Sequence, residues 1–319
     1  MTTYRKISII SIIAVFIIII SFQKSIREEY SNLAKITAEA SLIDFSFADA
    51  EFEPIVFYSD SIKIAGKIFN NPKRIKAPTI IILHGTHVLG KDQPLVLSLA
   101  KEFQKKDYNV LIFDFRGYNE SEDPKAVNSI DDLNFAEDVV SAINFLKEYP
   151  KVDTSKIFIL GHSFGAGVSL SAMNQIDCVK KYILFGAPRR VTERIISYSS
   201  KDRNQLIYKS INNLQLSYSV DSTILIEGIQ KRNIENYISL INQPSFNARF
   251  FLIDGSKEDP KDISFYKEMA AKLYPKANYY SIPGSDHYLN TGYFLDRPTY
   301  SKQMITHFVN KVDAWLKQT

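Results

Sequence analysis

One short segment combines a candidate nucleophile with unusually small neighbours. Residues 157–160 are apolar, and the next five residues are Gly-His-Ser-Phe-Gly, with Ser163 at their centre. Glycine at positions 161 and 165 lets a strand and a following helix approach each other closely, so the pattern predicts a tight strand-to-helix turn. Such a turn strains the serine backbone and directs free N–H groups of the helix N-terminus toward it. The segment therefore predicts a nucleophilic serine beside donors that stabilise an oxyanion.

The segments around this serine alternate between strand and helix patterns. Strands are predicted in a hairpin over 55–72 and at 78–85, 109–117, 156–163, 181–188, 248–255 and 277–284. Helices are predicted at 94–108, 131–149, 164–173, 263–273 and 301–317. The alternation with fully apolar central strands predicts an α/β fold, with a mostly parallel sheet and helices on both faces. Ligands bind such sheets beyond the carboxyl ends of the strands, where Ser163 is expected.

Residues 189–245 interrupt this alternation. They are polar, rich in tyrosine and asparagine, and mostly helical in their spacing. A segment of this length is too long for a simple loop. We therefore expect an inserted helical cap, and substrate choice would depend on it.

The bulk composition is that of a globular protein. Of the 319 residues, 45% are hydrophobic and 23% are charged, which is enough to build a sizeable core. The net charge is +4 with scattered basic residues, so no nucleic-acid partner is indicated. The single cysteine, Cys178, excludes an intramolecular disulfide and a paired-cysteine zinc site. We interpret Cys178 as a small packed residue, with a catalytic thiol as the alternative.

The order of several motifs resembles that of the α/β-hydrolase family of serine hydrolases. The resemblance covers about residues 55–318 and rests on FYSDSIKIAGKIF at 57–69, LHG at 83–85, FDFRGYNES at 113–121, GHSFGAG at 161–167, DGSKEDP at 254–260 and PGSDH at 283–287. The shared order from end to end is far more specific than the serine pentapeptide alone. One departure is Asn119, where the family usually has glycine, but asparagine tolerates a positive φ better than most residues.

The resemblance implies a histidine and an acid that follow the serine in the chain. His287 lies after the last predicted strand and fits the family order of serine, acid and histidine. The acid is expected just after residues 248–255, where it would orient His287 and stabilise its protonated form. The family's usual spacing falls on Glu258, whereas the commoner residue type stands at Asp259. Both remain candidates, with Asp259 placed first.

The other histidines are expected to have different roles. His162 would point away from the serine, His84 would shape the oxyanion loop, His87 is a candidate substrate contact, and His307 is expected on the surface of the last helix. The oxyanion hole would use the backbone N–H groups of Phe164 and Thr86.

These residues predict acyl transfer to water without a metal or an organic cofactor. His287 would deprotonate Ser163, which attacks a carbonyl to form an acyl-enzyme, and His287 would then activate water. The leading function is hydrolysis of carboxylic esters or thioesters of a small-molecule or lipid-like acyl substrate. A peptidase, an amidase or an acyltransferase would use the same residues. A binding protein that retained the fold is a second class, disfavoured because both nucleophile and base are present.

The N-terminal segment predicts membrane attachment. Residues 7–22 contain no charge and no proline, and no A-x-A cleavage pattern follows them. We interpret residues 1–24 as an uncleaved single-pass signal anchor and 25–54 as a tether to a hydrolase domain at 55–319. A cleaved signal peptide and a buried helix are the alternatives. Flanking charges are nearly balanced, and the short N-terminal tail favours a catalytic domain outside the cytoplasm, facing the periplasm or the exterior of a bacterium.

Overall fold

The computed structural model describes residues 43–44, 51–187, 214, 216–217, 220–294 and 297–318. The chain divides into two compact units, 1–44 and 45–319. In the first unit the described residues form the short strand β1 (Ile43–Asp44). The predicted anchor at 1–24 and most of the predicted tether at 25–54 lie outside the described residues. Within the described ranges, no helix is long and apolar enough to cross a membrane.

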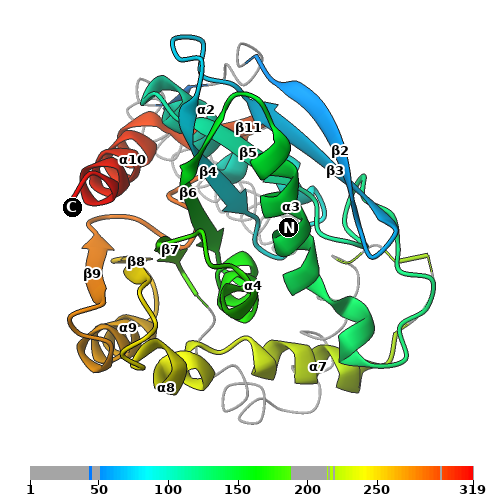
Figure 1. Cartoon of the computed structure of the whole chain (residues 1–319). Coiled ribbons are helices and arrows are strands. Elements are labelled where there is room, and N and C mark those ends of the chain that lie inside the picture. Colours follow the sequence, from blue (N-terminus) through cyan, green and yellow to red (C-terminus); the bar gives the residue numbers. More distant parts are fainter. Residues whose placement is uncertain are drawn as a thin grey trace, which may run out of the picture. The chain divides into compact units, whose positions relative to one another are not determined.

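A mixed sheet of eight strands forms the centre of the second unit (Figure 1), in the order β2-β3-β5-β4-β6-β7-β8-β9. The strands are β2 (Glu53–Ser59), β3 (Ile62–Phe69), β4 (Ala77–Leu83), β5 (Asn109–Phe113), β6 (Val152–His162), β7 (Lys181–Phe185), β8 (Arg249–Gly255) and β9 (Ala277–Ile282). The pairs β2–β3 and β3–β5 are antiparallel, and every other neighbouring pair is parallel. The predicted α/β fold with a mostly parallel sheet is confirmed.

Helices cover both faces of this sheet. The helices packed on the sheet are α2 (Pro94–Lys105), α3 (Phe135–Glu148), α4 (Phe164–Ala172), α9 (Pro260–Lys272) and α10 (Lys302–Leu316). Two further helices, α7 (Ser222–Lys231) and α8 (Ile238–Ile241), lie in the segment between β7 and β8. The central strand β4 shows why helices must cover both faces of the sheet. Its Ile81 and Leu83 lie in the apolar cluster shared with α3, α4 and α9, whereas Ile80 and Ile82 lie in the cluster shared with α2 and α10. Successive strand side chains point to opposite faces, so a continuously apolar strand must be buried on both.

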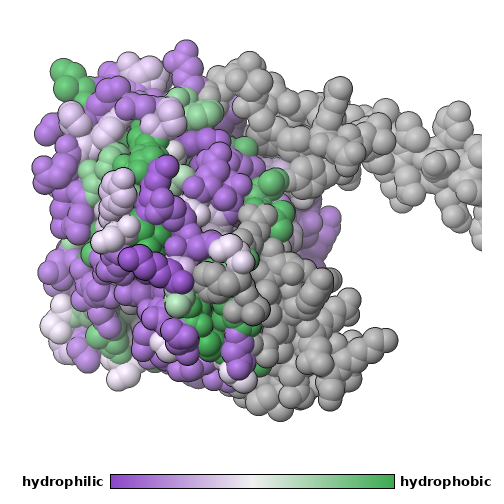
Figure 2. All heavy atoms as spheres, turned by 90° about the vertical axis from the view of Figure 1, so that its right-hand side faces the viewer, coloured by the Kyte–Doolittle hydropathy of each residue, from purple (hydrophilic) through white to green (hydrophobic). Residues whose placement is uncertain are grey.

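Short 3-10 helices and one hairpin complete the second unit. The 3-10 helices are η2 (Gly90–Asp92), η3 (Ile130–Leu133), η4 (Met173–Gln175) and η5 (Ile234–Tyr237). The antiparallel strands β10 (Gly292–Phe294) and β11 (Arg297–Ser301) were not predicted, because β10 has only three residues and β11 contains a proline and no run of apolar residues. Figure 2 shows that the described surface on one side is mostly hydrophilic, with separate apolar areas.

Two predicted helices start at different residues in the structure. The helix predicted from residue 131 begins at Phe135, because Ser129 and Asp132 form a capping box that starts η3 instead. The helix predicted from 263 begins at Pro260, directly after its N-cap, Asp259. In the described part of the predicted cap at 189–245, α7, η5 and α8 are helical, as the spacing indicated.

Candidate active site

Ser163 occupies the tight turn between β6 and α4. Its φ of 51° and ψ of −116° lie outside the regions that serine ordinarily adopts. A side chain at Gly161 would clash with the backbone of Ala166, and one at Gly165 would clash with the carbonyl of Leu83. Both glycines are therefore required for the close approach of strand and helix.

Four adjacent parallel strands bring the predicted site residues to one edge of the sheet. β6 ends directly before Ser163, and β7, β8 and β9 follow it in order across the sheet. Glu258 comes three residues after β8, and His287 comes five residues after β9. Because parallel strands end at the same edge, loops from distant parts of the sequence meet there.

His287 lies against Glu258. The His287 Nδ1 atom is 3.3 Å from Glu258 Oε2, and the other carboxylate oxygen accepts a hydrogen bond of 3.2 Å from the Gly255 N–H. The Glu258 side chain is 10% exposed and that of His287 is 30% exposed. The carboxylate is therefore fixed at both oxygens, and it holds the imidazole in one orientation and tautomer.

Asp259 has a different position. Its side chain is exposed and accepts a 2.8 Å hydrogen bond from the Lys261 N–H, which caps α9. Because Pro260 starts the helix, the preceding aspartate turns toward the free N–H groups of the first turn. The structure brings Glu258 to His287 and does not bring Asp259 there, so the ranking of Asp259 first is corrected.

Gly186, which the sequence analysis did not single out, makes room for the imidazole. It has a φ of 57°, and an added Cβ would lie 2.5 Å from His287 Cε1. The sequence offered one signal for this role of Gly186, namely a glycine immediately after β7, the strand next to β6.

His162 holds the loop that carries His287, because its Nε2–H donates to the His287 carbonyl over 2.9 Å. Burial lowers the pKa of His162 well below its usual value, so this ring is neutral.

The loop after β4 lies against the serine turn. An added Cβ on Gly85 would be 3.2 Å from Ser163 Cβ. His84 is fully buried; its Nδ1–H donates to the Gly85 carbonyl over 2.8 Å, and its Nε2 accepts from the Phe115 N–H over 3.3 Å. Burial lowers the pKa of His84 to about 4. A neutral His84 thus fixes the backbone that leads into Thr86, in agreement with its expected structural role.

A buried ion network anchors the same loop to the end of β5. Lys91 lies 2.8 Å from Asp114, 3.0 Å from Asp92 and 2.5 Å from Glu120. Burial alone would lower the pKa of Lys91, but these carboxylates raise it, so the ammonium stays charged. Asn119 has the positive φ of 45° expected for its turn and donates to the Asp114 carboxylate over 3.2 Å.

The two remaining histidines were not predicted to act as the base: His87 was a candidate substrate contact and His307 was expected on the surface of the last helix. His87, the candidate substrate contact, is partly buried in the loop after β4, and its Nδ1 accepts from the Leu89 N–H over 3.1 Å. His307 on α10 lies 2.8 Å from the Tyr280 hydroxyl, far along the chain from the serine turn.

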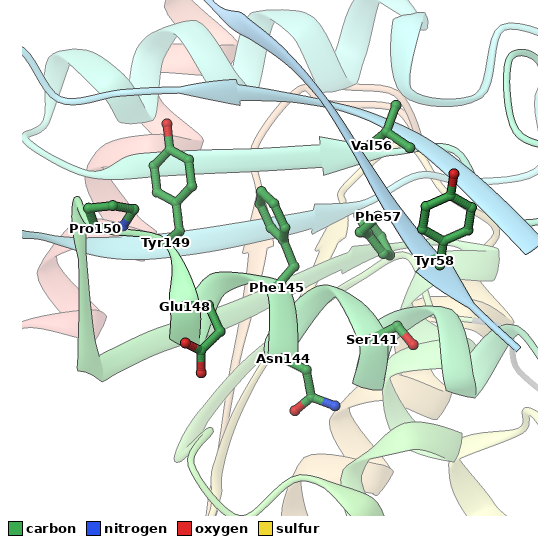
Figure 3. Close-up of a pocket in the computed structure, with 9 residues that line it drawn as sticks. All are labelled: Val56, Phe57, Tyr58, Ser141, Asn144, Phe145, Glu148, Tyr149 and Pro150. Carbon is green, nitrogen blue, oxygen red and sulfur yellow. The ribbon is translucent and has the colours of Figure 1, made fainter. Parts of the chain in front are cut away.

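One surface pocket is formed without any of the predicted site residues. A pocket of about 440 Å³ lies between β2 and α3 (Figure 3), and its lining includes Phe57, Tyr58, Phe145 and Tyr149 but none of the candidate catalytic residues. Across the described ranges, no group of three histidine, cysteine, aspartate or glutamate side chains is placed to hold a metal ion.

Fold and site together define an α/β hydrolase with a serine turn. The chain belongs to the family described as serine aminopeptidase, S33, whose profile matches residues 76–252. An esterase structure from Pyrococcus furiosus is similar over 84% of this chain and 91% of that chain, with a TM-score of 0.57 and 18% identity, which supports the fold.

Two characterised relatives match the chain locally. A polyketide transferase of Gibberella fujikuroi is 32% identical over 140 residues, covering 44% of this chain and 39% of that protein. A thiohydrolase of Eupenicillium brefeldianum is 33% identical over 114 residues, covering 35% of each. The chain therefore spans well under half the length of these relatives.

Proposed function

We propose that this protein is a serine hydrolase that cleaves carboxylic esters or thioesters through Ser163, His287 and Glu258. The observation that carries the proposal is the strained Ser163 at the same sheet edge as His287, whose Nδ1 lies 3.3 Å from the partly buried carboxylate of Glu258. A hydroxyl becomes an effective nucleophile only when a positioned base removes its proton. The esterase and thiohydrolase named above support ester and thioester substrates.

The mechanism follows from the orientation of His287. Its Nδ1–H donates to Glu258, which leaves Nε2 as the acceptor for the Ser163 hydroxyl proton. The serine oxygen attacks the substrate carbonyl, and the Phe164 and Thr86 N–H groups hold the resulting oxyanion. Protonated His287 then gives its proton to the leaving alcohol or thiol as the acyl-enzyme forms. Water, deprotonated by His287, releases the acid and restores Ser163.

Transfer of the acyl group to an acceptor other than water is the second candidate. It uses the same acyl-enzyme and differs only in the group that attacks it. The similarity to a polyketide transferase favours this alternative. The family is described as a serine aminopeptidase, so amide substrates should be assayed beside esters and thioesters.

The test is reaction with a fluorophosphonate, followed by location of the adduct by mass spectrometry. We expect one stoichiometric adduct on Ser163 and ester or thioester turnover that Ser163→Ala abolishes. Ser141→Ala, which removes a partly buried hydroxyl on α3, is the matched control and should leave both unchanged. Equal turnover by wild type and Ser163→Ala would overturn the proposal. Absence of both labelling and turnover in folded protein would favour the binding-protein class.

We also propose that residues 7–22 anchor the protein in a membrane, with the hydrolase domain outside the cytoplasm. The uncharged, proline-free run supports this placement. Deletion of residues 1–24 should move the protein from the membrane fraction to the soluble fraction. A mature protein that begins after residue 22 would instead identify a cleaved signal peptide.

A further inference from the structure

A buried arginine lies beside the residue that follows the nucleophile. Arg232, directly after α7, is 8% exposed. Its guanidinium carbon is 4.9 Å from the centre of the Phe135 ring and 5.1 Å from that of Phe164. Nη1 donates to the Gly228 carbonyl over 2.7 Å, and an added Cβ on Gly228 would come within 2.9 Å of the same atom. The cap helix thus provides space for the guanidinium above the aromatic side chains.

This arginine differs from two other buried cations, Arg116 and Lys91. Arg116 pairs with the buried Asp138 over 2.7 Å, and Lys91 pairs with the buried Asp114 over 2.8 Å. For Arg232, the part of the chain described here supplies no carboxylate within ion-pair distance. A buried charge without a counter-ion is costly, and proteins rarely retain one. Burial lowers the pKa of Arg232 to about 10, so the guanidinium is still charged at neutral pH.

One of the two rings under Arg232 belongs to a residue of the proposed oxyanion hole. Phe164 follows Ser163 and supplies one of the two oxyanion donors. Tyr118, whose ring centre is 6.1 Å from that of Phe164, also lies with its ring centre 5.0 Å from that of His84, two residues before Thr86, the source of the other donor. A group bound at the guanidinium would therefore lie beside Phe164, the residue next to the nucleophile.

We propose that Arg232 binds a carboxylate on the acyl part of the substrate, so that the enzyme prefers esters or thioesters of acids that carry a second, anionic group. The guanidinium fork matches a carboxylate in shape, and its Nε and Nη2 donors, which have no acceptor among the described residues, would supply charge-assisted hydrogen bonds. The surrounding rings exclude water, which strengthens that contact relative to a surface ion pair. This inference rests on the proposed hydrolase function and names its substrate class.

The experiment compares 4-nitrophenyl monoesters of adipic and suberic acid with 4-nitrophenyl esters of the unbranched monocarboxylic acids of equal length. Wild type should show a kcat/KM at least about tenfold higher for the anionic esters, as expected for one charged hydrogen-bonded contact. Arg232→Met should lower kcat/KM for the anionic esters about 10- to 100-fold and change that for the neutral esters less than about threefold. Arg232→Lys should retain an intermediate preference.

Lys231→Met is the matched control, because Lys231 is the adjacent cation but is 51% exposed and paired with Glu227 and Asp131. It should leave the preference for anionic esters unchanged, which excludes a general effect of net charge. Equal losses on anionic and neutral esters in Arg232→Met would show a structural role and overturn the inference. If Arg232→Met fails to fold, inhibition of wild type decides: adipate should inhibit neutral-ester turnover more strongly than hexanoate, and equal inhibition would refute the inference.

Failure of this inference is distinguishable from failure of the proposed function. Turnover of both ester classes at equal kcat/KM, together with labelling of Ser163, would refute carboxylate recognition and leave the hydrolase function standing. No turnover of either class and no labelling of Ser163 would refute the hydrolase function itself.

Discussion

Replacing Glu258 by glutamine tests the proposed triad most directly, because the change preserves shape and removes only charge and one acceptor. In the protein, one carboxylate oxygen accepts from the Gly255 N–H over 3.2 Å and the other faces His287 Nδ1 at 3.3 Å. A glutamine has a single acceptor oxygen, which the Gly255 bond would retain. Its NH2 group would then face His287 and stabilise the tautomer that is protonated at Nε2, which cannot accept the Ser163 proton.

The expected loss in kcat is large. Loss of the correct tautomer and of the charge that stabilises the imidazolium lowers kcat by about 10³- to 10⁴-fold in such triads. The 3.3 Å separation is longer than an ideal charged hydrogen bond, so we expect the lower end of this range. That loss corresponds to about 4 kcal/mol of transition-state stabilisation.

Asp259→Asn is the matched control, since asparagine caps a helix as well as aspartate does. Its kcat should stay within about threefold of wild type, and its free energy of unfolding within about 0.5 kcal/mol. The assay is kcat on one activated ester for both variants, with thermal unfolding to confirm that each is folded. Equal mild losses from the two variants, or a larger loss from Asp259→Asn, would refute the assignment of Glu258.

Three other substitutions give separate tests. Gly186→Ala places a methyl group 2.5 Å from His287 Cε1, at a residue with a positive φ. The kcat of this variant should fall by at least about 100-fold, and circular dichroism should show that the fold is retained. Asp138→Asn removes the buried counter-ion of Arg116 and leaves it only the exposed Asp60 at 3.2 Å, and urea unfolding should show a loss of about 3–5 kcal/mol in the free energy of unfolding; a loss below about 1 kcal/mol would contradict the importance of the buried pair. His84 protonates near pH 6.5 when unfolded but only near pH 4 when folded, so the unfolded state binds more protons between these values. The free energy of unfolding should therefore fall as the pH is lowered through this window, by about 3 kcal/mol from His84, and His84→Gln should remove that part of the dependence in urea titrations at pH 7 and 4.5. An unchanged pH dependence in His84→Gln would contradict this account.

Local sequence determined the parts of this protein that depend on near neighbours. Ser163 was identified because glycines two residues before and two after it are required wherever a strand turns directly into a helix. The parallel sheet was predictable because strands such as β4 carry an unbroken apolar run, here Ile80 to Leu83, and only burial on both faces accounts for that pattern. Helix starts at Phe135 and Pro260 were less predictable, because they depend on which side chain caps the free N–H groups.

Tertiary structure decided the contacts between distant segments. Glu258 and Asp259 are adjacent in sequence and similar in chemistry, and only the direction of the chain after β8 determines which carboxylate meets His287. The need for Gly186 arises from an imidazole about one hundred residues later in the chain, so no local pattern reveals it. Arg232 resembles any other cation at a helix end until the fold buries it over Phe164 and places no described carboxylate beside it. A residue type and its spacing predict local geometry, whereas the energy of a charge depends on which groups the fold brings near it.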